Sequence, residues 1–158
     1  NEAWEESIIV NLNAPFYAAR AALPYMRAND WGRIINMASA LSFFAQTGRA
    51  DYITTKTALL GLTRAIALEV ATTGVTCNSV CPGTVLTDAI DERIVALMSK
   101  ENISRDEAVG RFMVGRAPSG KFVDPESIAA MIAYLCGPYS KHINGAAMSV
   151  DGAWTAGR

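Results

Sequence analysis

Residues 33–38 read Arg-Ile-Ile-Asn-Met-Ala, a short apolar stretch that predicts a buried β-strand. Toward the C-terminus, residues 50–72 carry apolar side chains at helical spacing, and residues 75–81 form a second apolar run that stops at Pro82 and Gly83. Two strands joined by a helix of more than ten residues are typical of parallel pairing. The sequence therefore predicts an α/β fold built on a parallel sheet.

The remaining segments continue this alternation in both directions. Apolar residues recur every three to four positions over residues 2–27, which predicts a long helix that Pro15 and Pro24 interrupt. After the second strand we expect a helix over residues 88–99 and another over residues 104–114, which begins with a Ser104–Glu107 capping box. A further helix should run from Asp124-Pro125 to Gly137-Pro138, and a third strand should follow over residues 147–150. Helices on both faces of the sheet would make residues 1–158 a single doubly wound domain.

Composition excludes several classes of protein. The chain has 158 residues, of which 51% are hydrophobic, enough for one domain with a sizeable core. Its 14 basic and 15 acidic residues give a net charge of −1, so we expect no nucleic-acid partner. No apolar run approaches the roughly 18 residues of a membrane span and no signal peptide opens the chain, so we expect no membrane association.

The cysteines indicate a reducing environment. Cys77 and Cys81 stand four residues apart in the second strand, where strand geometry separates them by roughly 13 Å, too far for a disulfide. They are typical of reduced core thiols, and we expect a cytoplasmic protein. With one histidine, His142, and no closely spaced set of cysteines, we expect no metal site.

Three polar residues are expected to meet at the carboxyl end of the first strand. Ser39 follows that strand, at the edge where open α/β sheets bind their ligands. Tyr52 and Lys56 stand four residues apart on the next helix, so they share one face with about 5–6 Å between their Cβ atoms. We therefore expect all three side chains to face one crevice.

A lysine ammonium beside a tyrosine makes the phenol a usable acid–base group. A free tyrosine has a pKa of about 10, and lowering it to near 7 requires about 4 kcal/mol. An ammonium at about 4 Å supplies that amount at an effective dielectric constant of about 20. The three residues therefore predict proton exchange at an alcohol or carbonyl oxygen, with Ser39 donating to that oxygen and hydride transfer as the natural partner reaction.

These residues, in this order, resemble the classical short-chain dehydrogenase/reductase family along the whole chain. The matching motifs are Val10-Asn11-Leu12, Ile34-Ile35-Asn36-Met37-Ala38-Ser39, the Tyr-x-x-x-Lys pattern of Tyr52-Ile53-Thr54-Thr55-Lys56, Pro82-Gly83-Thr84-Val85-Leu86-Thr87 and Val150-Asp151-Gly152. Ser39 precedes Tyr52 by thirteen residues, as in the family. The resemblance implies a Rossmann-type fold and an NAD(P)-dependent oxidoreductase that transfers a hydride between the cofactor and a secondary alcohol or ketone.

The resemblance also implies a role for each matched residue. Tyr52 would be the acid–base group, Lys56 would lower its pKa and bind the nicotinamide ribose, and Ser39 would hold the substrate oxygen. Asn11 would link Lys56 to solvent through a water on its main-chain carbonyl. Pro15, which has no N–H, leaves that carbonyl without its usual helical partner, although an ordinary helix kink is the alternative explanation of Pro15. The implied cofactor-binding residues are Tyr52, Lys56, Pro82, Gly83, Val85 and Thr87.

The pyrophosphate-binding part of the family pattern is not in this sequence. No Gly-x-x-x-Gly-x-Gly or Gly-x-Gly-x-x-Gly turn occurs, nor the residue after it that selects NAD or NADP. The chain begins at Asn1 without Met, so we interpret it as a partial fold lacking the N-terminal dinucleotide-binding half, roughly the C-terminal two-thirds of such an enzyme. We expect residues 1–158 alone to bind the cofactor weakly and to be inactive.

Within the family, residues 75–87 and Val150-Asp151-Gly152-Ala153-Trp154 resemble D-3-hydroxybutyrate dehydrogenases. Those enzymes hold a small carboxylate with a basic residue three before the tyrosine, here Arg49, and have a tryptophan like Trp154. Leu41 replaces their histidine and Asp91 their glutamine, and Asp91 would repel a carboxylate. D-3-hydroxybutyrate is therefore the alternative to an unspecified secondary alcohol or ketone. Residues 88–121 would form the substrate lid, or else a plain pair of surface helices.

A second class of function is a non-catalytic oligomerisation piece. On the family pattern, helices near residues 2–28 and 50–72 pair with their copies across a dimer axis, so the resemblance implies a homodimer or homotetramer. For the enzyme, the expected partners are a small-molecule substrate and NAD or NADP.

Overall fold

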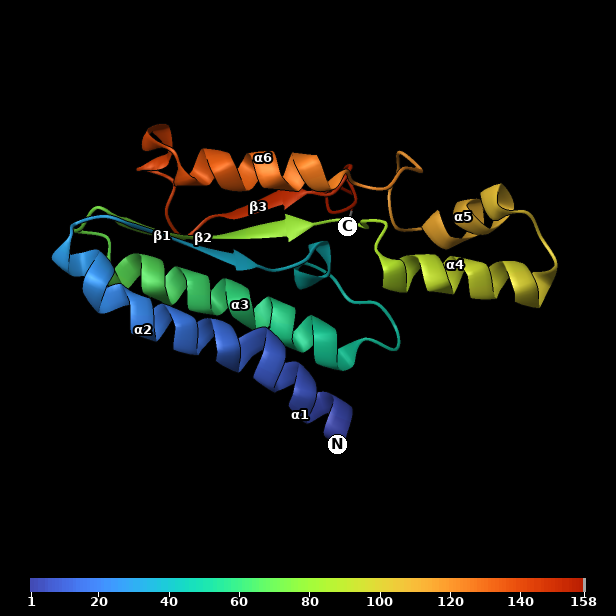
Figure 1. The fold of residues 1–158 in the computed structure, drawn as a ribbon, viewed down its shortest axis with the longest axis horizontal. Coiled ribbons are helices and arrows are strands. Elements are labelled where there is room, and N and C mark those ends of the chain that lie inside the picture. Colours follow the sequence, from blue (N-terminus) through green and yellow to red (C-terminus); the bar gives the residue numbers. More distant parts are fainter. Residues whose placement is uncertain (158) are drawn as a thin grey trace.

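Three parallel strands, β1 (Gly32–Met37), β2 (Val75–Pro82) and β3 (Ala147–Val150), form the sheet of the computed structural model, which describes residues 1–157 (Figure 1). The strand order is β1-β2-β3, so each strand lies beside the next one along the chain. The register aligns Ile34 with Cys77 and Val80 with Met148. The predicted parallel α/β architecture is confirmed.

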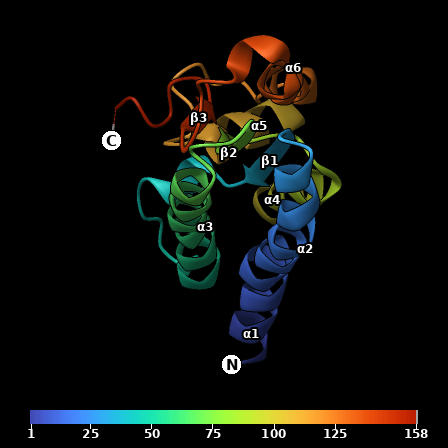
Figure 2. The ribbon, with the colours of Figure 1, turned by 90° about the vertical axis from the view of Figure 1, so that its left-hand side faces the viewer.

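Helices cover both faces of this sheet. The helices α2 (Ala14–Ala28) and α3 (Ala50–Glu69) lie on one face, and α6 (Pro125–Cys136) lies on the other (Figures 1 and 2). The remaining elements are α1 (Glu2–Ile8), a π-helical turn (Ile9–Asn13), α4 (Asp88–Glu101), α5 (Arg105–Met113) and two 3₁₀ turns (Ala40–Ser42 and Pro138–Ser140). Helices α4 and α5 lie beyond the carboxyl ends of the strands, so they border the edge where ligands bind in such sheets (Figure 1).

The long helix predicted over residues 2–27 contains a change of winding. After α1, the turn Ile9–Asn13 is π-helical, and the N–H of Ala14 donates to the carbonyl of Ile9. Pro15 stands two residues after the end of this turn, and because it has no N–H it cannot donate to the Asn11 carbonyl. Pro24, in contrast, lies inside α2 without ending it.

The core is divided between the two faces of the sheet. Toward α2 and α3, the buried cluster is Ala19, Ile66, Ala67 and Cys77, and toward α6 it is Val80, Ile128 and Leu135. Strand β2 contributes to both clusters because it is buried from Val75 to Cys81, as expected for a strand covered on both faces. Cys77 and Cys81 are free thiols, and burial raises the pKa of each to about 11.

Polar side chains inside the sheet are paired with neighbouring groups. Asn78 donates from Nδ2 to the carbonyl of Ile143 at 2.7 Å and accepts from the N–H of Ala146 at 3.0 Å. Both contacts of the Asn78 side chain are therefore with backbone groups. Among residues 1–157, no helix is both long and apolar enough to cross a membrane.

The predicted helix over residues 50–72 was too long. Helix α3 ends at Glu69, because the chain turns where the N–H and the hydroxyl of Thr73 both donate to the carbonyl of Val70. The hydroxyl contact is 2.7 Å long. Val70 is buried and continues the apolar period, which is why the pattern extended past the true end of the helix.

Candidate functional site

Ser39 is fixed at the carboxyl end of β1 by a short capping motif. Its hydroxyl accepts a hydrogen bond from the N–H of Leu41 at 3.1 Å, and its own N–H donates to the Ser42 hydroxyl at 3.2 Å. These two bonds cap the 3₁₀ turn Ala40–Ser42. The Ser42 hydroxyl in turn donates to the carbonyl of Lys56 at 2.9 Å, which attaches the turn to α3. The Ser39 side chain is therefore placed by both β1 and α3.

Tyr52 and Lys56 lie one turn apart on α3. The Lys56 ammonium nitrogen lies 5.7 Å from the centre of the Tyr52 ring and donates to the main-chain carbonyl of Met37 at 2.7 Å. Burial lowers the pKa of Lys56 from its ordinary value. The ring of Tyr52 packs against a buried cluster that includes Leu41 and Trp154.

A cavity of about 300 Å³ lies beside these residues, and we name it the serine–tyrosine cavity. Its lining comprises Ser39, Leu41, Gln46, Arg49, Tyr52, Gly83, Thr84, Val85, Thr87, Ala89, Ile90, Arg93, Phe112, Arg116 and Trp154. The structure therefore brings Ser39 and Tyr52 to one hollow, together with segments of the loop after β2 and of helix α4. Eight further candidates from the sequence lie in its lining or beside it.

Of those eight, six line the cavity itself. Leu41, Arg49, Trp154, Gly83 and Val85 all contribute to its wall, and so does Thr87 at the start of α4. Pro82, the last residue of β2, lies just outside the lining. Asp91 also lies outside, because its carboxylate pairs with Arg105 of α5. The carboxylate that would have repelled an acidic substrate is therefore directed to another helix.

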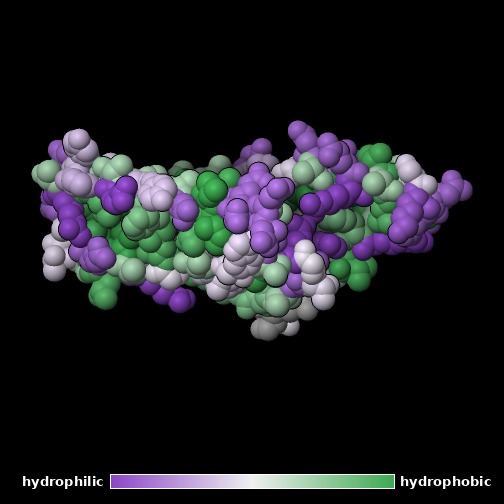
Figure 3. Space-filling view, turned by 90° about the horizontal axis from the view of Figure 1, so that it is seen from below, coloured by the Kyte–Doolittle hydropathy of each residue, from purple (hydrophilic) through white to green (hydrophobic). Residues whose placement is uncertain are grey.

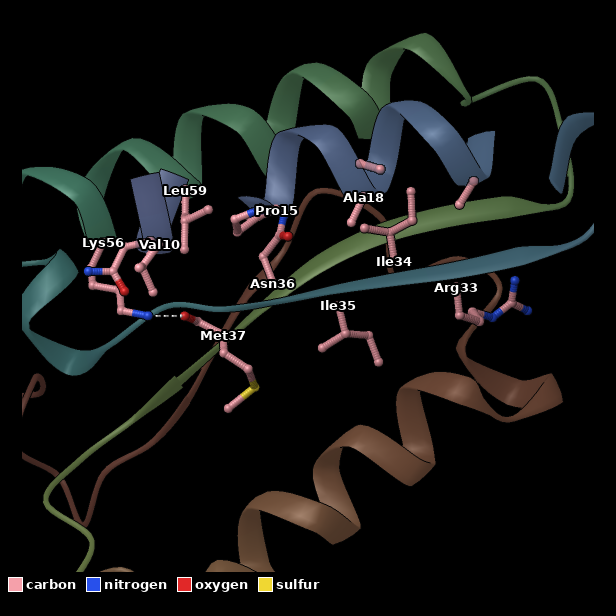
Figure 4. Close-up of a pocket in the computed structure, with 13 residues that line it drawn as sticks. Val10, Pro15, Ala18, Arg33, Ile34, Ile35, Asn36, Met37, Lys56 and Leu59 are labelled. Atoms are coloured by element: carbon pink, nitrogen blue, oxygen red, sulfur yellow. Dashed lines mark hydrogen bonds between the residues drawn. The ribbon is translucent and has the colours of Figure 1, made fainter. Parts of the chain in front are cut away.

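Lys56 and Asn11 line a second cavity of about 460 Å³, which we name the β1 cavity (Figure 4). It runs along β1 between that strand and helices α2 and α3, and Met37 and Pro15 also line it. The Lys56 side chain thus reaches the β1 cavity while its ammonium stays close to the Tyr52 ring, which lines the serine–tyrosine cavity. The four candidates occupy two neighbouring hollows, with Lys56 between them.

Gly83 allows the loop after β2 to lie against the end of β3. A Cβ atom at this position would lie 2.8 Å from the Cα of Asp151, closer than real Cβ atoms come. The N–H of Gly83 donates to the carbonyl of Val150 at 2.9 Å. Trp154, which follows β3, donates from Nε1 to the carbonyl of Gly115 at 2.8 Å. The C-terminal segment therefore fixes two walls of the serine–tyrosine cavity.

Two arginines of the cavity, Arg93 and Arg116, were not singled out from the sequence. On α4, Ala89, Ile90 and Arg93 are spaced by one, three and four residues, so they share a helix face that meets the cavity. Asp91 stands two residues from Arg93 and faces elsewhere. The spacing along α4 could have shown this from the sequence. Arg93 and Asp91 lie on different faces of the helix, so only one of these two charged side chains can face the cavity.

Comparison with known proteins identifies the family of the chain. The family model described as enoyl-(acyl carrier protein) reductase matches residues 1–155. D-beta-hydroxybutyrate dehydrogenases of Cupriavidus necator and Rhizobium meliloti are 38% and 39% identical to this chain over 155 residues. Each alignment covers 98% of this chain and 60% of the relative, so the chain spans about 60% of the length of these relatives.

A solved structure has the same fold. The crystal structure of an actinorhodin polyketide ketoreductase variant with NADPH matches with a TM-score of 0.88 and 32% sequence identity, covering 98% of this chain and 60% of that one. The family model, the relatives and the solved structure together confirm the resemblance drawn from the motifs. The chain belongs to the short-chain dehydrogenase/reductase family.

Proposed function

We propose that the full-length protein is an NAD(P)-dependent oxidoreductase that transfers a hydride between a nicotinamide cofactor and a secondary alcohol or ketone. The observation that carries the proposal is that Ser39 and Tyr52 line the same cavity. The Lys56 ammonium nitrogen lies 5.7 Å from the centre of the Tyr52 ring. The relatives are named as dehydrogenases and reductases, which supports the same class of reaction.

In this proposal, each polar residue handles the proton or the oxygen of the substrate. Tyr52 removes the hydroxyl proton of the alcohol during oxidation and returns a proton to the carbonyl oxygen during reduction. Ser39, whose hydroxyl oxygen already accepts from the N–H of Leu41, donates a hydrogen bond to the same substrate oxygen and keeps its proton. The Lys56 ammonium stabilises the phenolate form of Tyr52 electrostatically.

Asn11 completes the proton path in this proposal. It lines the β1 cavity together with Lys56, and Pro15 leaves its carbonyl without the ordinary helical donor. A water held by this carbonyl would connect the Lys56 ammonium to solvent. The π-helical turn around Asn11 supports the proposal, because such turns occur frequently at functional sites.

The residues present fit the nicotinamide end of the cofactor. Gly83, Val85 and Thr87 line the same cavity as Tyr52, and Lys56 offers N–H donors to a ribose hydroxyl. We assign the cofactor contacts to these five residues and to Pro82. When bound, the nicotinamide ring supplies or accepts the hydride.

Residues 88–121 form the substrate lid in this proposal. Helices α4 and α5 stand beyond the strand ends, and Ile90, Arg93 and Phe112 bring them to the cavity wall (Figure 1). Arg49 and Trp154 remain the candidates for holding the substrate, with Leu41 as an apolar wall. Since Asp91 is paired with Arg105, a carboxylate-bearing substrate such as D-3-hydroxybutyrate is compatible with the cavity.

The test is a hydride-transfer assay on the full-length protein with NAD and NADP against a panel of secondary alcohols and ketones. We expect turnover of at least one substrate, and Tyr52→Phe to lower kcat/KM by at least about a hundredfold. Tyr25→Phe, which removes a hydroxyl from an exposed residue of α2, is the matched control and should keep full activity. Equal activity in the Tyr52→Phe variant would refute the assignment.

A second proposed function is association with further copies of the chain as a homodimer or homotetramer. The helical layer of α1 to α3 exposes several large apolar side chains, namely Trp4, Ile9, Val10, Phe16, Tyr17 and Leu68. Figure 3 shows hydrophobic residues on this side in the part that α2 and α3 occupy, while hydrophilic ones dominate toward α4 and α5. Light scattering on the full-length protein and on its Phe16→Glu variant tests this: we expect an oligomer that the substitution weakens, and a monomeric wild type would contradict it.

A further inference from the structure

Three arginines from different segments meet at the serine–tyrosine cavity. Arg49 immediately precedes α3, Arg93 lies on α4, and Arg116 follows α5. The cavity lining contains no aspartate or glutamate among the residues that the structure describes. The hollow that contains Ser39 and Tyr52 therefore has a formal charge of +3.

In the described part of the chain, none of these guanidinium groups forms a salt bridge, although the charge of Arg49 contributes to lowering the pKa of Asp51. The ion pairs found within residues 1–157 join Arg27 to Glu69, Arg105 to Asp91 and Arg111 to Glu101. Each of the carboxylates of α4 that form ion pairs is thus bound to an arginine of α5 rather than to one of the cavity. The three cavity arginines form no salt bridge among these residues.

Aromatic rings support two of the three charges. The guanidinium carbon of Arg116 lies 4.1 Å from the centre of the Phe112 ring, and one of its N–H groups donates to the Phe112 carbonyl. The guanidinium carbon of Arg49 lies 5.9 Å from the centre of the Tyr52 ring. These contacts hold the cations in position without supplying a carboxylate as a counter-charge.

The arginines are close enough to affect one another. Burial, followed by the charges of Arg49 and Arg93, lowers the pKa of Arg116 from its ordinary value. Three like charges around one hollow destabilise the folded chain unless an anion enters it. An arrangement of this kind indicates a binding site for negatively charged groups.

We propose that Arg49, Arg93 and Arg116 select a substrate with two carboxylates. The proposal rests on the proposed function, since the alcohol or ketone carbon would lie at Ser39 and Tyr52. Each guanidinium presents a fork of N–H donors that matches one carboxylate, so three forks exceed what a single carboxylate satisfies. Because Arg49 belongs to the α3 wall and the other two belong to the lid, separate carboxylates fit better than one compact anion.

The cavity also limits the size of the substrate. Its volume of about 300 Å³ is at the lower end of the range for small-molecule sites. Its apolar lining comprises Leu41, Val85, Ala89, Ile90, Phe112 and Trp154. The small volume and the three arginines together favour a short hydroxy or keto dicarboxylic acid over a fatty acyl group.

Binding is tested first, with unreactive probes on the full-length protein. Glutarate, which has two carboxylates, should raise Tm, and butyrate, which has one, should raise it much less at equal ionic strength. Arg93→Gln and Arg116→Gln should each abolish most of the shift. Arg64→Gln, which removes an exposed arginine of α3 outside this cavity, should preserve it. Equal shifts for the two probes, or a glutarate shift that survives both cavity substitutions, would overturn the proposal.

Turnover is tested next with a matched pair of alcohols. 3-Hydroxyglutarate differs from 3-hydroxybutyrate by one added carboxylate, and we expect it to have a kcat/KM at least about tenfold higher. Arg93→Gln and Arg116→Gln should remove this preference mainly through KM. Turnover of 3-hydroxybutyrate without any preference would refute the dicarboxylate proposal and leave the proposed function standing. A glutarate shift without turnover of any alcohol would support the anion site and contradict the proposed function.

Discussion

The ammonium of Lys56 donates a hydrogen bond to the carbonyl of Met37 at 2.7 Å, so a side chain of α3 is fixed against the last residue of β1. The same group lies 5.7 Å from the centre of the Tyr52 ring. The hydrogen bond to Met37 therefore holds the ammonium in place near the Tyr52 ring. It also places Lys56 between the serine–tyrosine cavity and the β1 cavity.

Lys56 should titrate below the ordinary lysine value of 10.5, because burial lowers its pKa. Between the lowered pKa and 10.5, the unfolded chain still holds the proton that the folded protein has lost. The free energy of unfolding contributed by this group therefore rises with pH across that window. Lys56→Met should remove this part of the slope, as measured by urea unfolding of the full-length protein between pH 8 and 10.5. Identical slopes in the two proteins would contradict the prediction.

Ser7 should control the titration of Asp51. The Ser7 hydroxyl donates to Oδ2 of Asp51 at 2.6 Å, and this bond is the main reason that the pKa of Asp51 is lowered from 3.8. The stabilisation is present above pH 3.8 and is lost as the pH falls through the lowered value. In Ser7→Ala, carbon-detected NMR should show the Asp51 carboxyl titrating closer to 3.8. An unchanged titration would mean that the backbone hydrogen bonds dominate instead.

Leu135 should be a major contributor to stability. It is 0% exposed on α6 and packs in one cluster with Val80 and Ile128 of the sheet and helix. Leu135→Ala should lower the free energy of unfolding by about 2–5 kcal/mol, because it removes buried methyl groups and leaves a cavity. Leu68, which is 80% exposed on α3, provides the matched control. Leu68→Ala should cost less than about 0.5 kcal/mol in the same denaturant titration.

A polypeptide of residues 1–158 should bind NAD and NADP only weakly. The chain lacks a glycine-rich turn at a helix N-terminus, which is where the pyrophosphate of a dinucleotide binds. We expect isothermal titration calorimetry to give no micromolar dissociation constant for either cofactor. Micromolar binding by this polypeptide would show that other residues can replace that turn.

Most of the fold could be predicted from the apolar periods of the sequence. The third strand was placed at its observed bounds, and the capping box of Ser104 and Glu107 is present. The π-helical turn Ile9–Asn13 and the 3₁₀ turn Ala40–Ser42 were missed, because each depends on which nearby group accepts a hydrogen bond. Apolar periodicity carries no information about that choice.

The site was predictable where it depends on local spacing. Ser39 follows a strand, and Tyr52 lies one turn before Lys56 on α3, so their proximity follows from the topology. The arginine cluster was missed because it depends on how the lid folds back over the strand ends. Arg49 and Arg116 are far apart in the sequence, so no short sequence motif predicts that they line the same cavity. Arg93 faces the cavity because of the orientation of α4, which the sequence alone does not give.

Strand β1 is covered by helices on both faces, yet along its outer edge it has no partner strand among residues 1–157 (Figure 1). An apolar strand whose edge amides and carbonyls lack a neighbouring strand is a template for pairing with another polypeptide. Expressed by itself, this 158-residue polypeptide would therefore be prone to aggregate through β1. Measures that protect strand edges, such as a lysine on the outer rim or a solubilising fusion, would be needed to keep it dispersed at high concentration.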